Sequence, residues 1–191
     1  MDKKVLIFDC FGVVVSSLLT RWAKDVLIYK SLPDNFFVRI DSGELSEQEA
    51  LLQMAKLVNR EPEVVRKEID SYFKPNTELI SFMKELREKG YRIILLSNAA
   101  HSFFERFVFV EHPWFKELFD DIVISAAIKM VKPNSDIYLY TLSKNNLKPE
   151  DAIFIDDSEE NIIGSEKVGI PSVLFKDTAQ LKVELLKYNI S

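Results

Sequence analysis

Cysteine is nearly absent from this sequence, since Cys10 is the only one among 191 residues. An intrachain disulfide and a multi-cysteine zinc site are therefore excluded, and the composition fits a reducing compartment. The two histidines, His101 and His112, lie too far apart and too isolated to suggest a zinc site of their own. We expect Cys10 to pack in a core, and the protein to be cytoplasmic.

A block of basic residues is also missing. The chain has 25 Lys and Arg against 30 Asp and Glu, for a formal net charge of -5, and both signs are scattered along it. Nucleic acid and anionic membranes are therefore not expected as partners. No apolar run reaches membrane-spanning length, because Asp9 breaks the longest one, from Val5 to Leu19, near its middle. No small-residue cleavage site follows, so we expect a buried strand there rather than a secretory signal.

What the sequence does contain is a series of short β-rich runs, most of them continuously apolar. Such runs are typical of strands buried on both faces of a parallel sheet. The spaces between them carry helical patterns, and the alternation predicts an α/β fold with a doubly wound, Rossmann-like, five-stranded parallel sheet. The predicted strands are Val5–Asp9, Tyr91–Ser97, Asp121–Ser125, Ala152–Asp156 and Ser172–Phe175, and the clearest helices Thr77–Lys89, Asn134–Asn145 and Glu159–Val168.

The connection between the first two strands is irregular. It holds about seventy residues, far more than the dozen or so that a crossover needs. Within it, Ser46 and Glu49 form a capping-box pattern at the start of a helix, and Pro62 suits the first turn of the next one. We therefore predict an inserted helical cap. The cap is residues 15–75, and the core is residues 1–14 and 76–191.

Polar side chains gather where the predicted strands end. In an open parallel sheet, ligands bind at the carboxyl ends of the strands, near the point where the strand order reverses. A carboxylate nucleophile, a hydroxyl with an amide, a lysine and a carboxylate pair are the groups that phosphoryl transfer requires. The residues at these ends are Asp9, Ser97, Asn98, Lys129, Lys132, Asp156 and Asp157.

Four segments carry a resemblance to a known family. They are Val5–Val14 (VLIFDCFGVV), Ile94–Ala99 (ILLSNA), Lys132–Tyr138 (KPNSDIY) and Ile153–Asn161 (IFIDDSEEN). In this order and at strand ends, they resemble the motifs of the haloacid dehalogenase superfamily over nearly the whole chain. The closest likeness is to its phosphatase-like branch, with a small helical cap after the first motif. The resemblance implies a hydrolase with the fold described above.

The resemblance also implies roles for single residues. Asp9 is expected to attack phosphorus and form an aspartyl-phosphate. The carboxylates of Asp9 and Asp157, with the backbone carbonyl of Phe11, are expected to hold Mg²⁺, which prefers hard oxygen ligands. Asp156 is expected to lie outside these ligands and to orient the metal's waters or Lys132.

Three side chains are expected to meet the phosphoryl group. The resemblance implies that Ser97 and Asn98 hydrogen-bond its oxygens, and that Lys132 neutralises the charge developing during transfer. The cap is expected to exclude water and to select the substrate, a small phosphorylated metabolite. We expect the protein to act as a monomer or homodimer.

Phe11 departs from the phosphatase pattern. Phosphatases of this family have a second Asp two positions after the nucleophile, which serves as general acid and then as base. Phe11 transfers no proton, and losing such help typically costs about 10²–10⁴-fold in rate. We therefore expect phosphatase activity to be limited by Phe11.

Two alternatives remain open. A 2-haloacid dehalogenase-like hydrolase carries an aromatic residue at the position of Phe11, because halide leaves without a proton. Tyr138 matches the dehalogenase pattern as well, and Arg39 lies at a plausible distance along the chain for binding a substrate carboxylate. The pair Asp156 and Asp157 favours a metal site instead, since adjacent carboxylates near a third repel without a cation. A non-catalytic member that binds a phosphate ligand is the other alternative.

Overall fold

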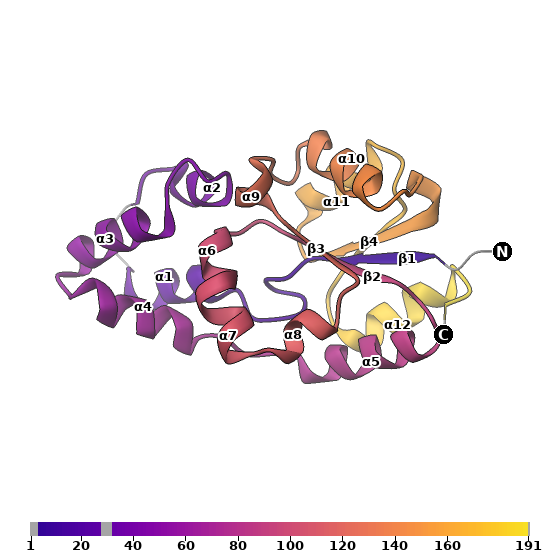
Figure 1. The fold of residues 1–191 in the computed structure, drawn as a ribbon, viewed down its shortest axis with the longest axis horizontal. Coiled ribbons are helices and arrows are strands. Elements are labelled where there is room, and N and C mark those ends of the chain that lie inside the picture. Colours follow the sequence, from indigo (N-terminus) through magenta and orange to yellow (C-terminus); the bar gives the residue numbers. More distant parts are fainter. Residues whose placement is uncertain (1–3, 28–31, 191) are drawn as a thin grey trace.

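One parallel sheet runs through the middle of the protein (Figure 1). In the computed structural model its strands lie in the order β3-β2-β1-β4-β5, with β1 (Val5–Phe8) in the centre. The predicted five-stranded, doubly wound sheet is therefore confirmed, with strand ends shifted by at most two residues. The other strands are β2 (Ile93–Ser97), β3 (Asp121–Ile124), β4 (Ala152–Asp156) and β5 (Ser172–Leu174), all paired in parallel.

The structure describes residues 4–27 and 32–190. Residues 1–3, 28–31 and 191, which belong to the predicted core and cap ranges, lie outside the described residues. No helix in the described part of the chain is both long enough and apolar enough to span a membrane.

Helices cover both faces of the sheet, and alternate strand residues divide between them. Leu6 and Phe8 belong to one hydrophobic core, and Val5 and Ile7 belong to the other. This alternation explains why the strand is continuously apolar, because each of its faces is buried. The helices α5 (Thr77–Glu88) and α12 (Thr178–Leu186) lie on the first face, whereas α10 (Ser135–Lys144) and α11 (Glu159–Glu166) lie on the second (Figure 1).

The segment between β1 and α5 forms a helical group beside the end of the sheet (Figure 1). The two chain connections to this group run side by side, since Val15 pairs with Pro75 and the Asn76 N–H donates to the Val14 carbonyl at 2.9 Å. This crossing falls at the predicted boundaries 14/15 and 75/76. The described helices of the group are α1 (Leu18–Val26), α2 (Phe36–Asp41), α3 (Glu47–Val58) and α4 (Pro62–Ser71).

The predicted start of α3 is confirmed in atomic detail. The Glu49 N–H donates to Ser46 Oγ at 3.2 Å, and the Ser46 N–H donates to the Glu49 carboxylate at 3.0 Å. Pro62 occupies the first turn of α4, as predicted.

Several short helices were not predicted. Their sequences are rich in aromatic residues and lack clear start and stop signals, so tertiary packing decides their conformation. They are α6 (His101–Phe103), a π-helical turn (Phe104–Val108), α7 (Phe109–Glu111), α8 (Trp114–Glu117), α9 (Ser125–Ile128) and a 3₁₀ turn (Pro149–Asp151).

The capping box gives a first testable prediction. Ser46→Ala removes the side-chain acceptor of the Glu49 N–H, so the free energy of unfolding should fall by about 0.5–2 kcal/mol, measured by urea denaturation. Ser81→Ala is the matched control, because Ser81 lies exposed inside α5 and only back-bonds to the Thr77 carbonyl. That change should be neutral or stabilising by a few tenths of a kcal/mol. Equal losses for both variants would contradict the capping role.

Candidate active site

The two central carboxylates meet where the strand order reverses. The chain passes from β1 to β2 and β3 on one side, and then returns to place β4 on the other side of β1. Asp9 directly follows β1, and Asp156 is the last residue of β4. Phe8 is in register with Ile155, and the Asp9 N–H donates to the Ile155 carbonyl at 2.8 Å. Backbone pairing therefore brings both carboxylates to the expected ligand-binding edge.

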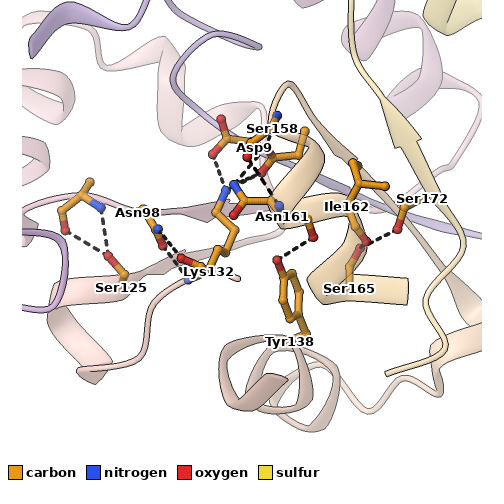
Figure 2. A network of polar contacts seen from close by, with 12 residues as sticks. Asp9, Asn98, Ser125, Lys132, Tyr138, Ser158, Asn161, Ile162, Ser165 and Ser172 are labelled. Atoms are coloured by element: carbon orange, nitrogen blue, oxygen red, sulfur yellow. Dashed lines mark hydrogen bonds and ion pairs between the residues drawn. The ribbon is translucent and has the colours of Figure 1, made fainter. Parts of the chain in front are cut away.

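Lys132 lies between these carboxylates (Figure 2). Its Nζ is 2.5 Å from Asp9 Oδ1 and 2.7 Å from Asp156 Oδ2, and all three side chains are buried. Burial disfavours the ammonium charge, but the two carboxylates outweigh it and hold the pKa of Lys132 above its usual range. The lysine is therefore charged at neutral pH, at the point where the sequence predicted it.

Asn98 fixes the backbone of Lys132. Its side-chain amide donates to the Lys132 carbonyl and accepts from the Lys132 N–H, both at 2.9 Å. Helix α11 packs closely on the next residue, since a Cβ at Gly164 would lie 2.4 Å from the Pro133 carbonyl oxygen. Both groups of the Asn98 amide are therefore already hydrogen-bonded, and its predicted contact with a phosphoryl group stays a prediction.

Asp156 is held by several donors at once. Besides Lys132, it accepts from the Ser158 N–H at 2.9 Å and from Asn161 Nδ2 at 3.0 and 3.1 Å (Figure 2). Tyr138 supports this arrangement, because its buried hydroxyl donates to the Asn161 carbonyl at 2.8 Å. The arrangement matches the expectation that Asp156 orients Lys132.

Asp157 completes a group of three carboxylates. One oxygen from each of Asp9, Asp156 and Asp157 can be chosen so that all three lie within 4.8 Å of one another. Asp157 approaches the turn after β1 closely, because Gly12 opposite it has no side chain. A Cβ at Gly12 would lie 2.1 Å from Asp157 Oδ2, and the Gly12 φ of +96° also favours glycine.

The charge balance of this group favours a cation. Burial, together with the Asp156 charge, raises the pKa of Asp9 to about 7 despite the opposing effect of Lys132. Burial and the Asp156 charge also raise the pKa of Asp157. One lysine thus leaves three carboxylates incompletely neutralised, and clustered carboxylate oxygens are the ligands that Mg²⁺ prefers.

The backbone at Phe11 fits the predicted metal site as well. In the turn after β1, the Cys10 carbonyl accepts from Val14 and Val15, and the Val15 carbonyl accepts from Gly12. Among the described residues, no backbone donor takes the Phe11 carbonyl in this turn. The residues present therefore fit a divalent cation held by Asp9, Asp157 and this carbonyl.

The remaining predicted residues differ in their surroundings. Ser97 ends β2 and is fully buried, and among the described residues its hydroxyl has no partner except the neighbouring Cys10 thiol. Cys10 itself packs in the core, as expected. Arg39 has a half-exposed side chain facing Glu44 at 3.9 Å, and it does not line the cavity described next.

A cavity of about 430 Å³ adjoins the carboxylates. It is bounded on the core side by Phe11, Asn98 and Asp157, and on the other side by helices α1 to α4. The Phe11 ring lies 6.0 Å from Phe103 and 6.1 Å from Phe104, centroid to centroid. Sequence reasoning missed most of the lining, because its residues come from distant segments with no common motif.

Comparison with known proteins decides the family. The model of the family described as haloacid dehalogenase-like hydrolase matches residues 2–175. The chain belongs to this family. Its similarity to curated members is low but long: it is 24% identical to a sesquiterpene phosphatase of Aspergillus oryzae over 95% of this chain and 94% of that one. A phosphoglycolate phosphatase of Aquifex aeolicus is 24% identical over 90% of this chain and 84% of its own.

Solved structures of the family share the fold. A family enzyme from Bacteroides thetaiotaomicron, in complex with magnesium and inorganic phosphate, matches with a TM-score of 0.76 at 21% identity, over 94% of this chain and 99% of that one. An L-2-haloacid dehalogenase from Xanthobacter autotrophicus matches with a TM-score of 0.66 at 15% identity, over 100% and 85%. This haloacid dehalogenase-like hydrolase therefore shares its fold with both kinds of enzyme, and the chemistry depends on its own side chains.

Gly12 gives a prediction for the site. Gly12→Ala should displace Asp157 and weaken Mg²⁺ binding, measured by calorimetry, besides a strain cost of about 1–3 kcal/mol. Gly169→Ala is the matched control, because Gly169 has a similar φ of +87° but its Cβ would meet only Pro149, at 3.4 Å. The control should lose comparable stability and keep its Mg²⁺ affinity. Unchanged Mg²⁺ affinity in Gly12→Ala would contradict the close approach of Asp157.

The raised pKa of Asp9 gives a second prediction. A carboxyl whose pKa is higher in the folded chain stabilises the fold below pH 4, and this contribution is lost as the pH rises to about 7. The metal-free protein should therefore lose stability over this range more steeply than Asp9→Asn does, measured by thermal unfolding in EDTA. Mg²⁺ should raise the unfolding temperature more at pH 8 than at pH 5, because it binds the deprotonated carboxylates. An equal effect at both pH values would count against the site.

Proposed function

We propose that this hydrolase is a Mg²⁺-dependent phosphatase that acts on small phosphorylated metabolites through Asp9. The carboxylate cluster of Asp9, Asp156 and Asp157 around the charged Lys132 carries the proposal. The names of two relatives, a sesquiterpene phosphatase and a phosphoglycolate phosphatase, support it. So does the structural neighbour in complex with magnesium and inorganic phosphate.

Asp9 is the nucleophile in this proposal. One of its oxygens is held by Lys132, which leaves the other to attack phosphorus. The bond from phosphorus to the ester oxygen breaks, and an aspartyl-phosphate forms on Asp9. Water then attacks phosphorus, releases inorganic phosphate and restores the carboxylate. Bound Mg²⁺ would supply charge neutralisation for the phosphoryl oxygens.

Lys132, Asp156 and Ser97 support this transfer. The ammonium of Lys132 neutralises charge on the phosphoryl group, and Asp156 keeps it in place. The buried Ser97 hydroxyl at the end of β2 is available to donate to a phosphoryl oxygen, as is the Asn98 N–H that follows it. These roles follow the original expectations, with the Asn98 side chain assigned to positioning Lys132.

Phe11 limits the range of leaving groups. No proton reaches the ester oxygen from this position, so the leaving group departs most readily when its alcohol is acidic. Phe11 also contributes its ring to the cavity wall. We therefore expect hydrolysis of activated esters to be efficient and hydrolysis of simple alkyl phosphates to be slow.

Dehalogenation is the second candidate. The aromatic Phe11 and the likeness to an L-2-haloacid dehalogenase fold favour it. Against it stands the third carboxylate, Asp157, at a site with only one buried lysine. The other two traits also fit poorly, since the Tyr138 hydroxyl is bonded to the backbone and Arg39 lies outside the cavity lining. Halide release without Mg²⁺ would decide for this candidate, and phosphate-analogue binding without any turnover would decide for a non-catalytic member.

Turnover of p-nitrophenyl phosphate tests the proposal. We expect activity that requires Mg²⁺ and falls by at least about 10³-fold in Asp9→Asn, because the nucleophile is lost. The good leaving group makes an acid at position 11 unnecessary. Absence of turnover in folded protein with Mg²⁺ would rule out general phosphatase function.

Phe11→Asp tests the cause of the limited range. The added carboxyl should raise turnover of an alkyl phosphate by up to about 10²–10⁴-fold and change turnover of p-nitrophenyl phosphate much less. Phe11→Asn is the matched control, since it loses the same ring contacts and cannot act as an acid. A similar gain in both variants would show that removal of the ring, rather than proton transfer, is responsible.

A further inference from the structure

We propose that the substrate is a phosphate monoester with an uncharged, apolar organic group of roughly a dozen heavy atoms. This inference rests on the proposed function, because the phosphoryl group must be at Asp9. Its basis is the cavity beside the carboxylates, whose lining comes from both the helical group and the core.

The lining of the cavity is predominantly apolar. Apolar walls with a few polar groups are typical of sites for small organic molecules. At about 30 Å³ for each water-sized atom, 430 Å³ holds roughly 14 heavy atoms. The apolar side chains are Phe11, Leu18, Leu19, Phe37, Ile40, Ala50, Leu51, Met54, Ile69, Ala99, Ala100 and Phe103.

The arginines of the lining are already paired. Arg106 donates from Nε to Glu47 at 2.7 Å and from Nη1 to Asp70 at 2.8 Å, and its guanidinium lies over the Phe103 ring at 5.4 Å. Arg66 forms an ion pair with Glu63. Neither guanidinium is therefore free to neutralise a second negative charge on a substrate.

The remaining charged group of the lining on the helical side is a carboxyl. Among the described residues, the Asp41 side chain forms no ion pair or hydrogen bond, although its backbone carbonyl accepts from Ser125 Oγ at 2.6 Å. Burial raises the pKa of Asp41 to about 6, with Lys132 opposing the rise, so this carboxyl is mostly ionised at pH 7 and above. An anionic organic group would meet its charge without a compensating cation, which favours an uncharged one.

The cavity continues to the reacting carboxylates. Asp157 belongs to the carboxylate cluster and also lines the cavity, as do Phe11 and Asn98. A phosphoryl group at Asp9 therefore directs its ester substituent toward the cavity, along the Phe11 ring. Phe11 serves both features, because it removes the acid and extends the apolar wall.

A series of 4-alkylphenyl phosphates tests this inference. The alkyl chain lengthens from none to hexyl while the acidity of the leaving phenol stays nearly constant. We expect kcat/KM to rise by up to about fourfold per methylene until the cavity is full. By contrast, 4-carboxyphenyl phosphate should react at least tenfold more slowly than the 4-ethyl ester, although its phenol is the better leaving group.

Two neighbouring positions on α2 provide matched variants. Phe37 lines the cavity and is 36% exposed, whereas Val38 is 56% exposed and does not line it. Phe37→Gln should flatten the dependence on chain length and leave phenyl phosphate turnover unchanged. Val38→Gln should retain the full dependence, so a general effect of changing α2 is distinguished from loss of the apolar wall.

The outcomes separate this inference from the proposed function. Turnover of phenyl phosphate with no dependence on chain length overturns the apolar substrate and leaves the phosphatase intact. Absence of all turnover overturns the phosphatase, and calorimetric binding of the same esters to Asp9→Asn with Mg²⁺ then tests the cavity. Affinity that rises with chain length supports the apolar site, and affinity that is constant or undetectable overturns it.

Discussion

The buried contact of Lys132 with Asp9 and Asp156 is the interaction on which the rest of the structure depends. It joins the ends of β1 and β4 to the loop that precedes α10, at the point where the strand order reverses. Removing one partner of such a group typically costs about 3–5 kcal/mol, because a charge is left buried and unpaired. Asn98 and Asn161 hold its members, so the surrounding hydrogen bonds keep the charges aligned.

The contact also explains why a metal site lies beside it. Lys132 neutralises part of the negative charge but leaves Asp157 with no partner of opposite sign among the described ion pairs. A phosphoryl group brings further negative charge to this edge of the sheet. A divalent cation held by oxygen ligands balances both. The fold itself allows phosphatases and dehalogenases alike, so the third carboxylate carries the distinction.

Phe11 connects the chemistry of the site with its shape. The same ring that replaces an acid contacts Phe103 and Phe104 and forms part of the cavity wall. Loss of proton transfer and preference for an apolar substrate therefore arise from one residue. The cavity adds selectivity through its size and its lack of a free cation, which are properties of helices α1 to α4 rather than of the sheet.

The sequence by itself determined the sheet, the capping box of Ser46 and the gathering of Asp9, Lys132 and Asp156. Apolar runs and parallel pairing depend on local patterns, and parallel strands necessarily bring their carboxyl ends together. Only the tertiary structure decided that the Asn98 side chain holds Lys132, that Gly12 makes room for Asp157, and that Asp41 faces an apolar cavity. These features depend on how segments distant in the sequence pack against one another, and such packing leaves no periodicity or spacing to read.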